Sequence, residues 1–243
     1  MTAPAADRVL GIVGGVGPES TIDYYRSLVA AWRRRRPDGS YPRVIIDSVD
    51  AGQVMRFLGE GEFGAVGRAL GAALGELAAA GCGCALIASN ATHLAFDVID
   101  PPPSMPMIHI VEAARDAAVA AGHHRLGLIG TRYVMQSRLY PDRFEPAGLS
   151  IVLPTPAEQD LVHAIYMNEL VLGEFRDDSR ERLVAVIASM RDRDSIDSVI
   201  LGGTELALTL TEPAYADVPI LNTAQIHVEA AAEWLLGGEE MAP

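Results

Sequence analysis

The chain has 243 residues, of which 49% are hydrophobic and 21% charged, a balance typical of globular proteins with a buried core. Its net charge of −13 argues against a nucleic-acid partner, because such binding depends on Lys and Arg neutralising phosphates. No stretch is apolar over the length of a membrane span and no basic, apolar leader opens the chain, so we expect a cytoplasmic protein without membrane contact.

Short apolar runs alternate with longer stretches of helical period along the first half. The pattern predicts strands at residues 9–13, 43–47, 85–88 and 107–110 and helices at residues 21–34, 64–80 and 111–121. Such alternation is typical of βαβ units in a parallel sheet. The basic run at residues 33–36 is interpreted as the solvated end of the first helix.

The second half repeats this pattern. Residues 125–130 (RLGLIG) mirror 9–14 (VLGIVG), Gly203 mirrors Ser89, and 219–222 mirror 106–109, at offsets of 113 to 116 residues. Three landmarks in the same order indicate an internal duplication of α/β units. Two such domains facing each other would form a cleft at the carboxyl ends of their strands, where open parallel sheets bind ligands.

A glycine-rich loop, residues 14–20 (GGVGPES), joins the first strand to the first helix. Glycines allow close backbone approach, and amides at a helix N-terminus favour an anion. The spacing is not that of a dinucleotide-binding loop, and a tight structural turn explains it equally well. Asp50, after the second strand, is better explained as a helix N-cap than as a ligand contact.

Cysteine and histidine positions do not predict a disulfide or a metal site. Cys82 and Cys84 are spaced for neither a disulfide nor a CxxC redox pair. His93, His109 and His227 lie on separate segments without metal-ligand spacing, and a structural role is favoured for each. We expect no metal.

Two segments that follow predicted strands, one in each half of the chain, are the most informative about chemistry. Residues 87–93 (IASNATH) and 201–206 (LGGTEL), with the opening loop and 130–135 (GTRYVM), resemble the cofactor-independent aspartate/glutamate racemase family. The resemblance spans nearly the whole chain, including 163–173, which is similar to the helix before the last strand of these enzymes. In that family each strand-end motif carries a cysteine; one thiolate removes the α-proton and the other thiol returns it.

The resemblance implies two Rossmann-like α/β domains related by pseudo-twofold symmetry, with the active cleft between them. It also implies that the last segment crosses back onto the first domain. The domains are then residues 1–110 plus about 222–243, and residues 111–221. The same resemblance implies a homodimer that acts in amino acid metabolism with no cofactor, and thus without pyridoxal phosphate.

Family positions carry over to this chain with two replacements, since Ser89 and Gly203 stand where the cysteines are expected. The catalytic positions are thus Ser89, His93, Glu205 and Gly203, the position of a lost cysteine. Thr131 would donate to a substrate carboxylate, and Arg132 is either a carboxylate clamp or a surface residue paired with an acid. The expected substrate-binding residues are Val16, Gly17, Ser48, Asn90, Ala91, Thr92, Thr131, Arg132 and Thr204.

Serine is a far weaker base than a thiol, and glycine has no side chain to act. We therefore expect the chain to bind a small amino or dicarboxylic acid and to perform isomerase-type or carbanion chemistry rather than two-cysteine racemisation. Two alternatives stay open, a cofactor-independent lyase or decarboxylase in a specialised pathway, and an inactive carboxylate-binding protein. A hydrolase is disfavoured because no GxSxG elbow surrounds Ser89.

Overall fold

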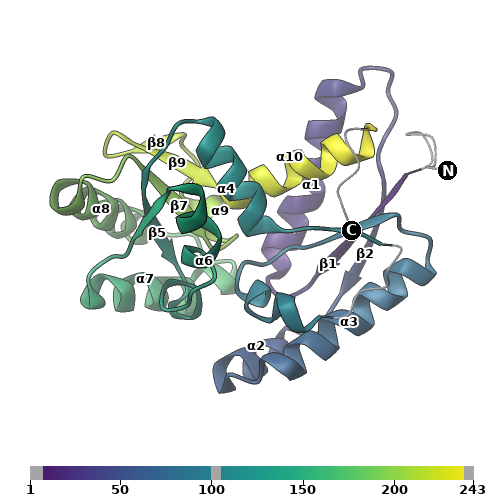
Figure 1. Ribbon diagram of the computed structural model, residues 1–243, viewed down its shortest axis with the longest axis horizontal. Helices are drawn as coiled ribbons and strands as arrows, with labels where there is room; N and C mark the ends of the chain where they lie inside the picture. Colours follow the sequence, from purple (N-terminus) through teal and green to yellow (C-terminus); the bar gives the residue numbers. More distant parts are fainter. Residues whose placement is uncertain (1–7, 100–104, 238–243) are drawn as a thin grey trace. The chain divides into compact units, whose positions relative to one another are not determined.

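A computed structural model describes residues 8–99 and 105–237 (Figure 1). The chain divides into two compact units. Unit 1 comprises Met1–Ile110 and Ala224–Pro243, and unit 2 comprises Val111–Thr223. In the described ranges, no helix is both long enough and apolar enough to cross a membrane.

The sheet of unit 1 has four parallel strands in the order β2-β1-β3-β4. All six residues of β1 are buried, as a central strand covered on both faces requires. Val13 pairs with both Asp47 and Ile87, so three strands end at the same edge. The strands are β1 (Val9–Gly14), β2 (Arg43–Ser48), β3 (Cys84–Ile87) and β4 (Met107–Ile108).

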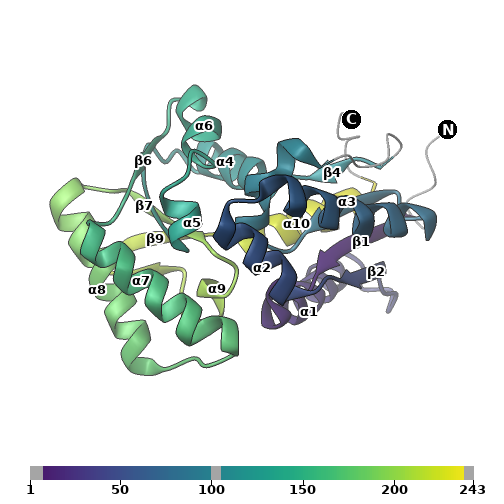
Figure 2. The same ribbon diagram turned by 90° about the horizontal axis from the view of Figure 1, so that it is seen from below.

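Helices cover both faces of this sheet (Figures 1 and 2). Helices α2 and α3 lie on one side of β1, and α1 and α10 lie on the other. A Cβ on Gly11 of β1 would lie 3.1 Å from Leu77 of α3, which shows how closely that face is packed. The helices are α1 (Pro18–Arg35), α2 (Ala51–Glu60), α3 (Phe63–Ala79), the 3₁₀ segment η2 (Ala91–Val98) and α10 (Thr223–Leu235).

Helix α10 completes the core of unit 1 although it comes last in the chain. Its buried residues pack with Tyr24 and Leu28 of α1 and with Leu10 of β1; they are Ala224, Val228, Ala231, Ala232, Trp234 and Leu235. The Arg8 guanidinium, just before β1, donates to the Trp234 carbonyl at 2.5 Å. Burial of these side chains makes the hydrophobic effect the main force holding α10 on unit 1.

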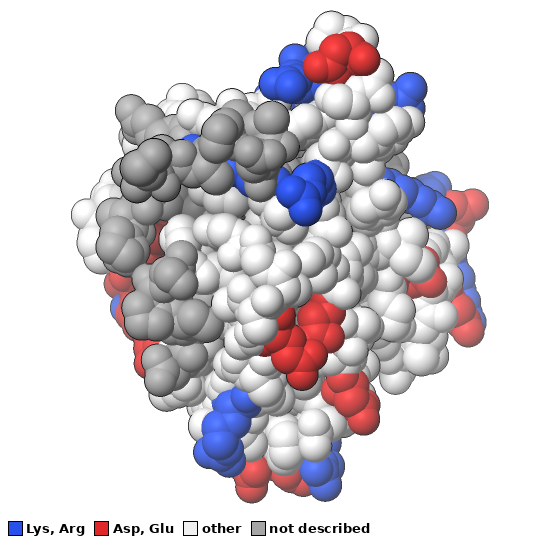
Figure 3. All heavy atoms as spheres, turned by 90° about the vertical axis from the view of Figure 1, so that its right-hand side faces the viewer, with Lys and Arg blue, Asp and Glu red and all other residues white. Residues whose placement is uncertain are grey.

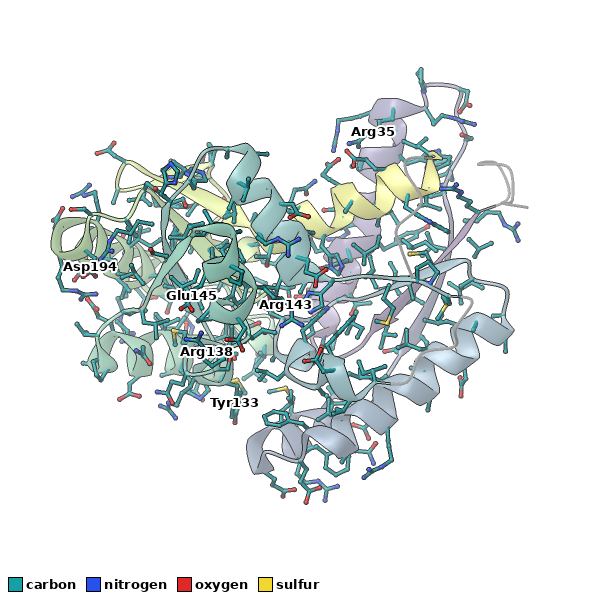
Figure 4. All side chains as sticks on the ribbon, viewed as in Figure 1. Arg35, Tyr133, Arg138, Arg143, Glu145 and Asp194 are labelled. Carbon is teal, nitrogen blue, oxygen red and sulfur yellow. The ribbon has the colours of Figure 1, made fainter. Side chains whose placement is uncertain are left out.

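Acidic side chains surround the basic run at the end of α1. Arg34 and Arg35 both pair with Glu229 of α10, at 2.5 and 2.6 Å, and Arg36 pairs with Asp38 at 3.2 Å. Arg35 is labelled beside α10 in Figure 4. On the face drawn in Figure 3, basic and acidic side chains occur in small separate groups. The interpretation of this run as a solvated helix end is confirmed.

The sheet of unit 2 has five strands in the order β6-β5-β7-β9-β8, of which only β8 is antiparallel to its neighbour. Ile129 of β5 pairs with Leu201 of β7, the counterpart of the Val13 and Ile87 pair in unit 1. The strands are β5 (Arg125–Gly130), β6 (Ser150–Val152), β7 (Ser198–Gly202), β8 (Ala214–Tyr215) and β9 (Val218–Asn222).

Helices α7 and α8 cover one face of this sheet, and α4 and α6 the other (Figures 1 and 2). Thr155 caps α7: its hydroxyl accepts from the Glu158 amide, and the Glu158 carboxylate accepts from the Thr155 amide. The remaining elements are α4 (Ile110–Ala120), α5 (Arg132–Met135), α6 (Pro141–Phe144), η3 (Glu145–Ala147), α7 (Pro156–Asn168), η4 (Leu170–Leu172), α8 (Asp177–Asp194) and α9 (Leu206–Thr209).

Both sheets use the same order for their first four parallel strands. The prediction of two similar α/β domains with parallel sheets is therefore confirmed. In each unit the first strand is flanked by the second on one side and the third on the other, so the chain reverses direction across the sheet there. Ligands of open parallel sheets bind at such a switch point, beyond the carboxyl ends of the strands.

Candidate functional site

The glycine loop after β1 is packed tightly against the end of β2. Gly15 has φ of 88°, and a Cβ there would lie 2.5 Å from the Ser48 hydroxyl, so only glycine fits. Its amide donates to the Thr21 hydroxyl at 2.9 Å and is engaged within the loop. Of the expected ligand residues, Gly17 is buried, Val16 is partly exposed and Ser48 is exposed.

Asp50 forms the N-cap of α2. Its carboxylate accepts from the Gln53 amide at 3.2 Å. An Asp side chain at this position satisfies an amide that would otherwise lack a partner at the start of the helix. The helix-cap explanation of Asp50 is confirmed, and the residue is not part of the candidate site.

Strand β3 leads into a buried polar turn that contains Ser89. The side chains of Thr92 and His93 both bond to the Ser89 carbonyl oxygen, at 3.1 and 2.7 Å. His93 therefore donates from Nδ1 to the carbonyl oxygen of Ser89. This hydrogen bond directs Nδ1 to the backbone of Ser89 and not to its side-chain Oγ. Such a geometry orients the turn but does not resemble the hydroxyl–imidazole pair of a serine nucleophile. Buried residues of the turn are Ser89, Asn90, Ala91, Thr92 and His93.

Three histidines that are distant in sequence meet beneath this turn. The His93 ring lies 4.6 Å from that of His109 and 6.3 Å from that of His227, centre to centre. Phe96 stacks on His93 at 5.6 Å. Within the residues that the structure describes, no group of His, Cys, Asp or Glu has the arrangement of a metal site. The three imidazoles and Phe96 thus form a cluster of closely packed rings.

In unit 2, Thr131 and Arg132 follow β5. The Thr131 hydroxyl accepts from the Val134 amide at 3.4 Å as the N-cap of α5. Arg132 pairs with Asp160 at 2.7 Å, and the side chains of the two residues are 43% and 68% exposed. Arg132 thus has the surface ion pair that was one of its two predicted roles.

Strand β7 ends at Gly202, and another side chain occupies the space beside the backbone of the next residue, Gly203. A Cβ at Gly203 would lie 2.8 Å from both Cζ and Oη of Tyr166, well inside van der Waals contact. Tyr166 comes from the last turn of α7 and is 7% exposed. Its ring therefore fills the place that a side chain at 203 would take.

The Tyr166 phenol belongs to a buried hydrogen-bonded group. Its hydroxyl donates to the Glu205 carboxylate, and the Thr204 hydroxyl donates to the same oxygen at 3.1 Å. Glu205 and Thr204 are each 3% exposed. Burial, and then the charge of Glu205, raise the pKa of Tyr166 well above its ordinary value, so the phenol stays protonated.

Neither cysteine lies at the carboxyl end of a strand. Cys82 precedes β3, and Cys84 is its first residue. Both are buried free thiols. Burial raises the pKa of Cys82, and it raises that of Cys84 to about 12, so neither forms a thiolate readily near neutral pH.

The expected residues therefore fall into two strand-end groups, one in each unit. Unit 1 brings the Ser89 turn and the glycine loop to the ends of β3 and β1, and unit 2 brings Thr131 and residues 203–205 to the ends of β5 and β7. Sequence reasoning missed Tyr166, which lies in the segment 163–173 and was given no role there. The empty side-chain position at Gly203 was the signal that a neighbour must fill it.

Two α/β units with mainly parallel sheets and polar groups at the strand ends are typical of the class of α/β proteins in which small molecules bind at this edge of the sheet. The particular family follows from comparison. Residues 13–231 match the family model described as Asp/Glu/Hydantoin racemase, and the chain belongs to this family.

Solved structures agree with this assignment. A candidate Asp/Glu racemase from Yersinia pestis is 29% identical, with a TM-score of 0.84 over 94% of this chain and 99% of that one. An aspartate racemase homologue from Pyrococcus horikoshii is 28% identical, with a TM-score of 0.78 over the same shares. Glutamate racemase from Francisella tularensis, solved in complex with D-glutamate, shares the fold at 12% identity. The TM-score is 0.62 over 95% of this chain and 81% of that one.

Proposed function

We propose that this chain binds a small amino or dicarboxylic acid through its strand-end groups and acts on it by isomerase-type or carbanion chemistry without two thiols. The observation that carries the proposal is the filling of the Gly203 position by Tyr166, which bonds to Glu205. A polar, proton-bearing side chain thus lies where the family expects its second cysteine. Ser89 stands at the first such position.

Hydroxyls and backbone amides are the groups that we assign to carboxylate binding. The two arginines that follow Thr131 most closely in the chain are held at the surface. Arg132 pairs with Asp160, and Arg138 pairs with Asp142 and Glu145; Arg138 and Glu145 are labelled in Figure 4. A few amides and hydroxyls bind a carboxylate whatever the net charge of the protein. Asn90 and Thr131 are the buried polar side chains proposed for this role, because Thr92 and Thr204 already donate their hydroxyl protons to Ser89 and Glu205.

Independence from pyridoxal phosphate is supported by the composition. All 19 basic residues are arginine, so this chain has no lysine at all. Pyridoxal phosphate enzymes hold their cofactor as a Schiff base with a lysine. The proton chemistry is therefore assigned to the side chains of the chain itself.

One alternative is specifically favoured by the same geometry. A phenol packed into the space of a lost side chain also suits a protein that keeps its ligand site and catalyses nothing. A lyase or decarboxylase remains the other alternative, because both would pass through the same stabilised carbanion. We also propose a homodimer, which light scattering at several protein concentrations tests directly.

The deciding experiment incubates the protein with L- and D-aspartate and L- and D-glutamate in deuterated water. Enzyme-dependent entry of deuterium at the α-carbon, followed by NMR, is expected and would overturn the inactive-binder alternative. Thermal stabilisation by the same acids measures binding independently. Ser89→Ala tests the first strand-end position, and Ser40→Ala, in a turn where Ser40 bonds to Asp38, is the matched control. If the protein shows neither deuterium exchange nor thermal stabilisation with any of these acids, the proposal is wrong.

A further inference from the structure

Gly203 and Tyr166 are 37 residues apart in sequence but form one packing unit. The Tyr166 ring reaches the end of β7 from α7, and its Oη lies 2.8 Å from where a Cβ at 203 would be. Replacement of Gly203 by any other residue requires the ring to move. The phenol oxygen is thus the polar atom that this strand end offers in place of a side chain at 203.

This oxygen is hydrogen-bonded to both residues that follow Gly203, Thr204 and Glu205. The Tyr166 hydroxyl donates to a Glu205 carboxylate oxygen, which also accepts from Thr204 at 3.1 Å. All three side chains are buried. A hydrogen bond between a buried phenol and a buried carboxylate has the geometry needed to pass a proton between the two oxygens.

We propose that Tyr166 and Glu205 act as a proton-accepting pair that replaces the side chain missing at Gly203; this inference rests on the proposed function. In the forward step the substrate C–H bond breaks and its electron pair stays on carbon. The proton bonds to Tyr166 Oη while the phenol proton moves to Glu205 Oε2. The pair gains one proton, and the reverse movement returns it.

The direction of this transfer follows from charge. If the pair instead released its one proton, a buried phenolate would lie beside a buried carboxylate, which like-charge repulsion opposes. The pair therefore takes up a proton first and then gives one back. A single base of this kind returns a proton to the face that lost it. Deuterium enters the substrate when the proton held by the pair exchanges with the solvent before the return, so deuterium should enter faster than the configuration inverts.

The test compares the wild-type protein with Tyr166→Phe and Glu205→Gln, using L- and D-aspartate and L- and D-glutamate in deuterated water. Phe keeps the ring that fills the space at 203, and Gln keeps the carboxylate's shape but cannot accept a proton. Each variant should slow exchange by about 100-fold or more, the usual contribution of a general base. The thermal stabilisation by the bound acid should stay near that of the wild type, since a proton-transfer role affects turnover and not binding.

Tyr140→Phe is the matched control. Tyr140 is also a fully buried tyrosine of unit 2, and its hydroxyl bonds to Thr223. The Tyr140→Phe variant should catalyse deuterium exchange into the substrate at the wild-type rate. Chiral chromatography of the recovered acid measures inversion alongside exchange.

Two outcomes would contradict the proton-accepting role of Tyr166 and Glu205 while leaving the proposed function intact. One is undiminished deuterium exchange in Tyr166→Phe, and the other is inversion of configuration as fast as exchange in the wild type. Absence of exchange in the wild type with measurable stabilisation overturns the pair and the catalytic part of the proposed function together. Where Tyr166→Phe lowers the melting temperature strongly, Glu205→Gln decides. Undiminished exchange in that variant also overturns the pair.

Discussion

The Tyr24 hydroxyl lies 3.0 Å from Nδ1 of His227, although the two residues are 203 positions apart in sequence. Nε2 of the same imidazole lies 2.8 Å from the Ile108 carbonyl oxygen. Tyr24 donates to Nδ1 and Nε2 donates to Ile108, so both nitrogens are used by the neutral ring. Helix α1, strand β4 and helix α10 thus meet at one uncharged histidine inside unit 1.

This histidine should make unit 1 sensitive to acid. Burial lowers the pKa of His227 from 6.5 to about 4, so between these values the unfolded chain binds a proton that the folded unit does not. The contribution of His227 to the free energy of unfolding is fully present above pH 6.5, and the free energy of unfolding falls by about 3 kcal/mol as the pH drops to about 4. Guanidinium unfolding followed by tryptophan fluorescence measures it, because Trp32 and Trp234 both lie in this core.

Comparison of two variants isolates the effect. His227→Gln removes the titrating ring and should flatten the dependence between pH 4 and 6.5, whatever its cost at neutral pH. His124→Gln, at an exposed position, should keep the wild-type dependence. An equally steep loss of stability in His227→Gln would contradict the assignment.

Gly203→Ala should destabilise unit 2. The added methyl would lie 2.8 Å from Cζ and Oη of Tyr166, and overpacking of a core of this kind costs about 1–3 kcal/mol. Scanning calorimetry measures the loss. The extra cost should shrink in a Tyr166→Ala background, since the clash is with that ring.

Gly75→Ala is the contrasting case. Gly75 lies inside α3, and a Cβ added there would have no heavy atom within 4 Å, so alanine should stabilise the protein by about 0.5–1 kcal/mol through helix propensity. A similar loss at both glycines would show that packing against Tyr166 is not the cause.

Native thiols should react slowly with iodoacetamide at pH 8. With the pKa of Cys84 at about 12, only about one molecule in ten thousand carries a thiolate there, and the pKa of Cys82 is raised as well. Any exchange activity should survive this treatment. Ser89→Cys should add a third modifiable thiol and make that activity sensitive, which mass spectrometry and repeated exchange assays would record.

Thr155→Ala should cost about 1 kcal/mol by removing the cap of α7. The alanine variant loses the bonds of the Thr155 hydroxyl with the Glu158 amide and carboxylate but keeps the bond from its own amide to that carboxylate, whereas Thr155→Ser retains a hydroxyl in the same place. Urea unfolding followed by circular dichroism compares the two variants. Since α7 also contains Tyr166, the Thr155→Ala variant should position the Tyr166 side chain less firmly, although Thr155 lies at the other end of the helix.

Much of the fold could be predicted from the sequence because its strands and helices carry strong periodic patterns. The helix expected at residues 64–80 is α3 (Phe63–Ala79), and the strand expected at 43–47 is β2 (Arg43–Ser48). Both differ only at their ends, where capping decides the boundary. The antiparallel strand β8 was not expected, since a strand of two residues has no periodicity to detect.

The candidate site was only partly predictable. Local motifs identified the turns that contain Ser89 and Glu205, because strand ends and turn residues are encoded nearby in the chain. The ring of Tyr166 beside Gly203 depends on how α7 packs on β7, and no local pattern encodes that contact. The meeting of His93, His109 and His227 escaped detection for the same reason, as each comes from a different element.

The return of α10 to unit 1 has a consequence for how the protein is made. The first 110 residues leave the ribosome long before α10 does, and until then Leu10, Tyr24 and Leu28 lack the apolar surface that covers them in the finished core. Unit 2 is continuous in sequence and can fold first during synthesis. The nascent first segment should therefore be the form that chaperones bind and proteases cut, until translation reaches the last helix.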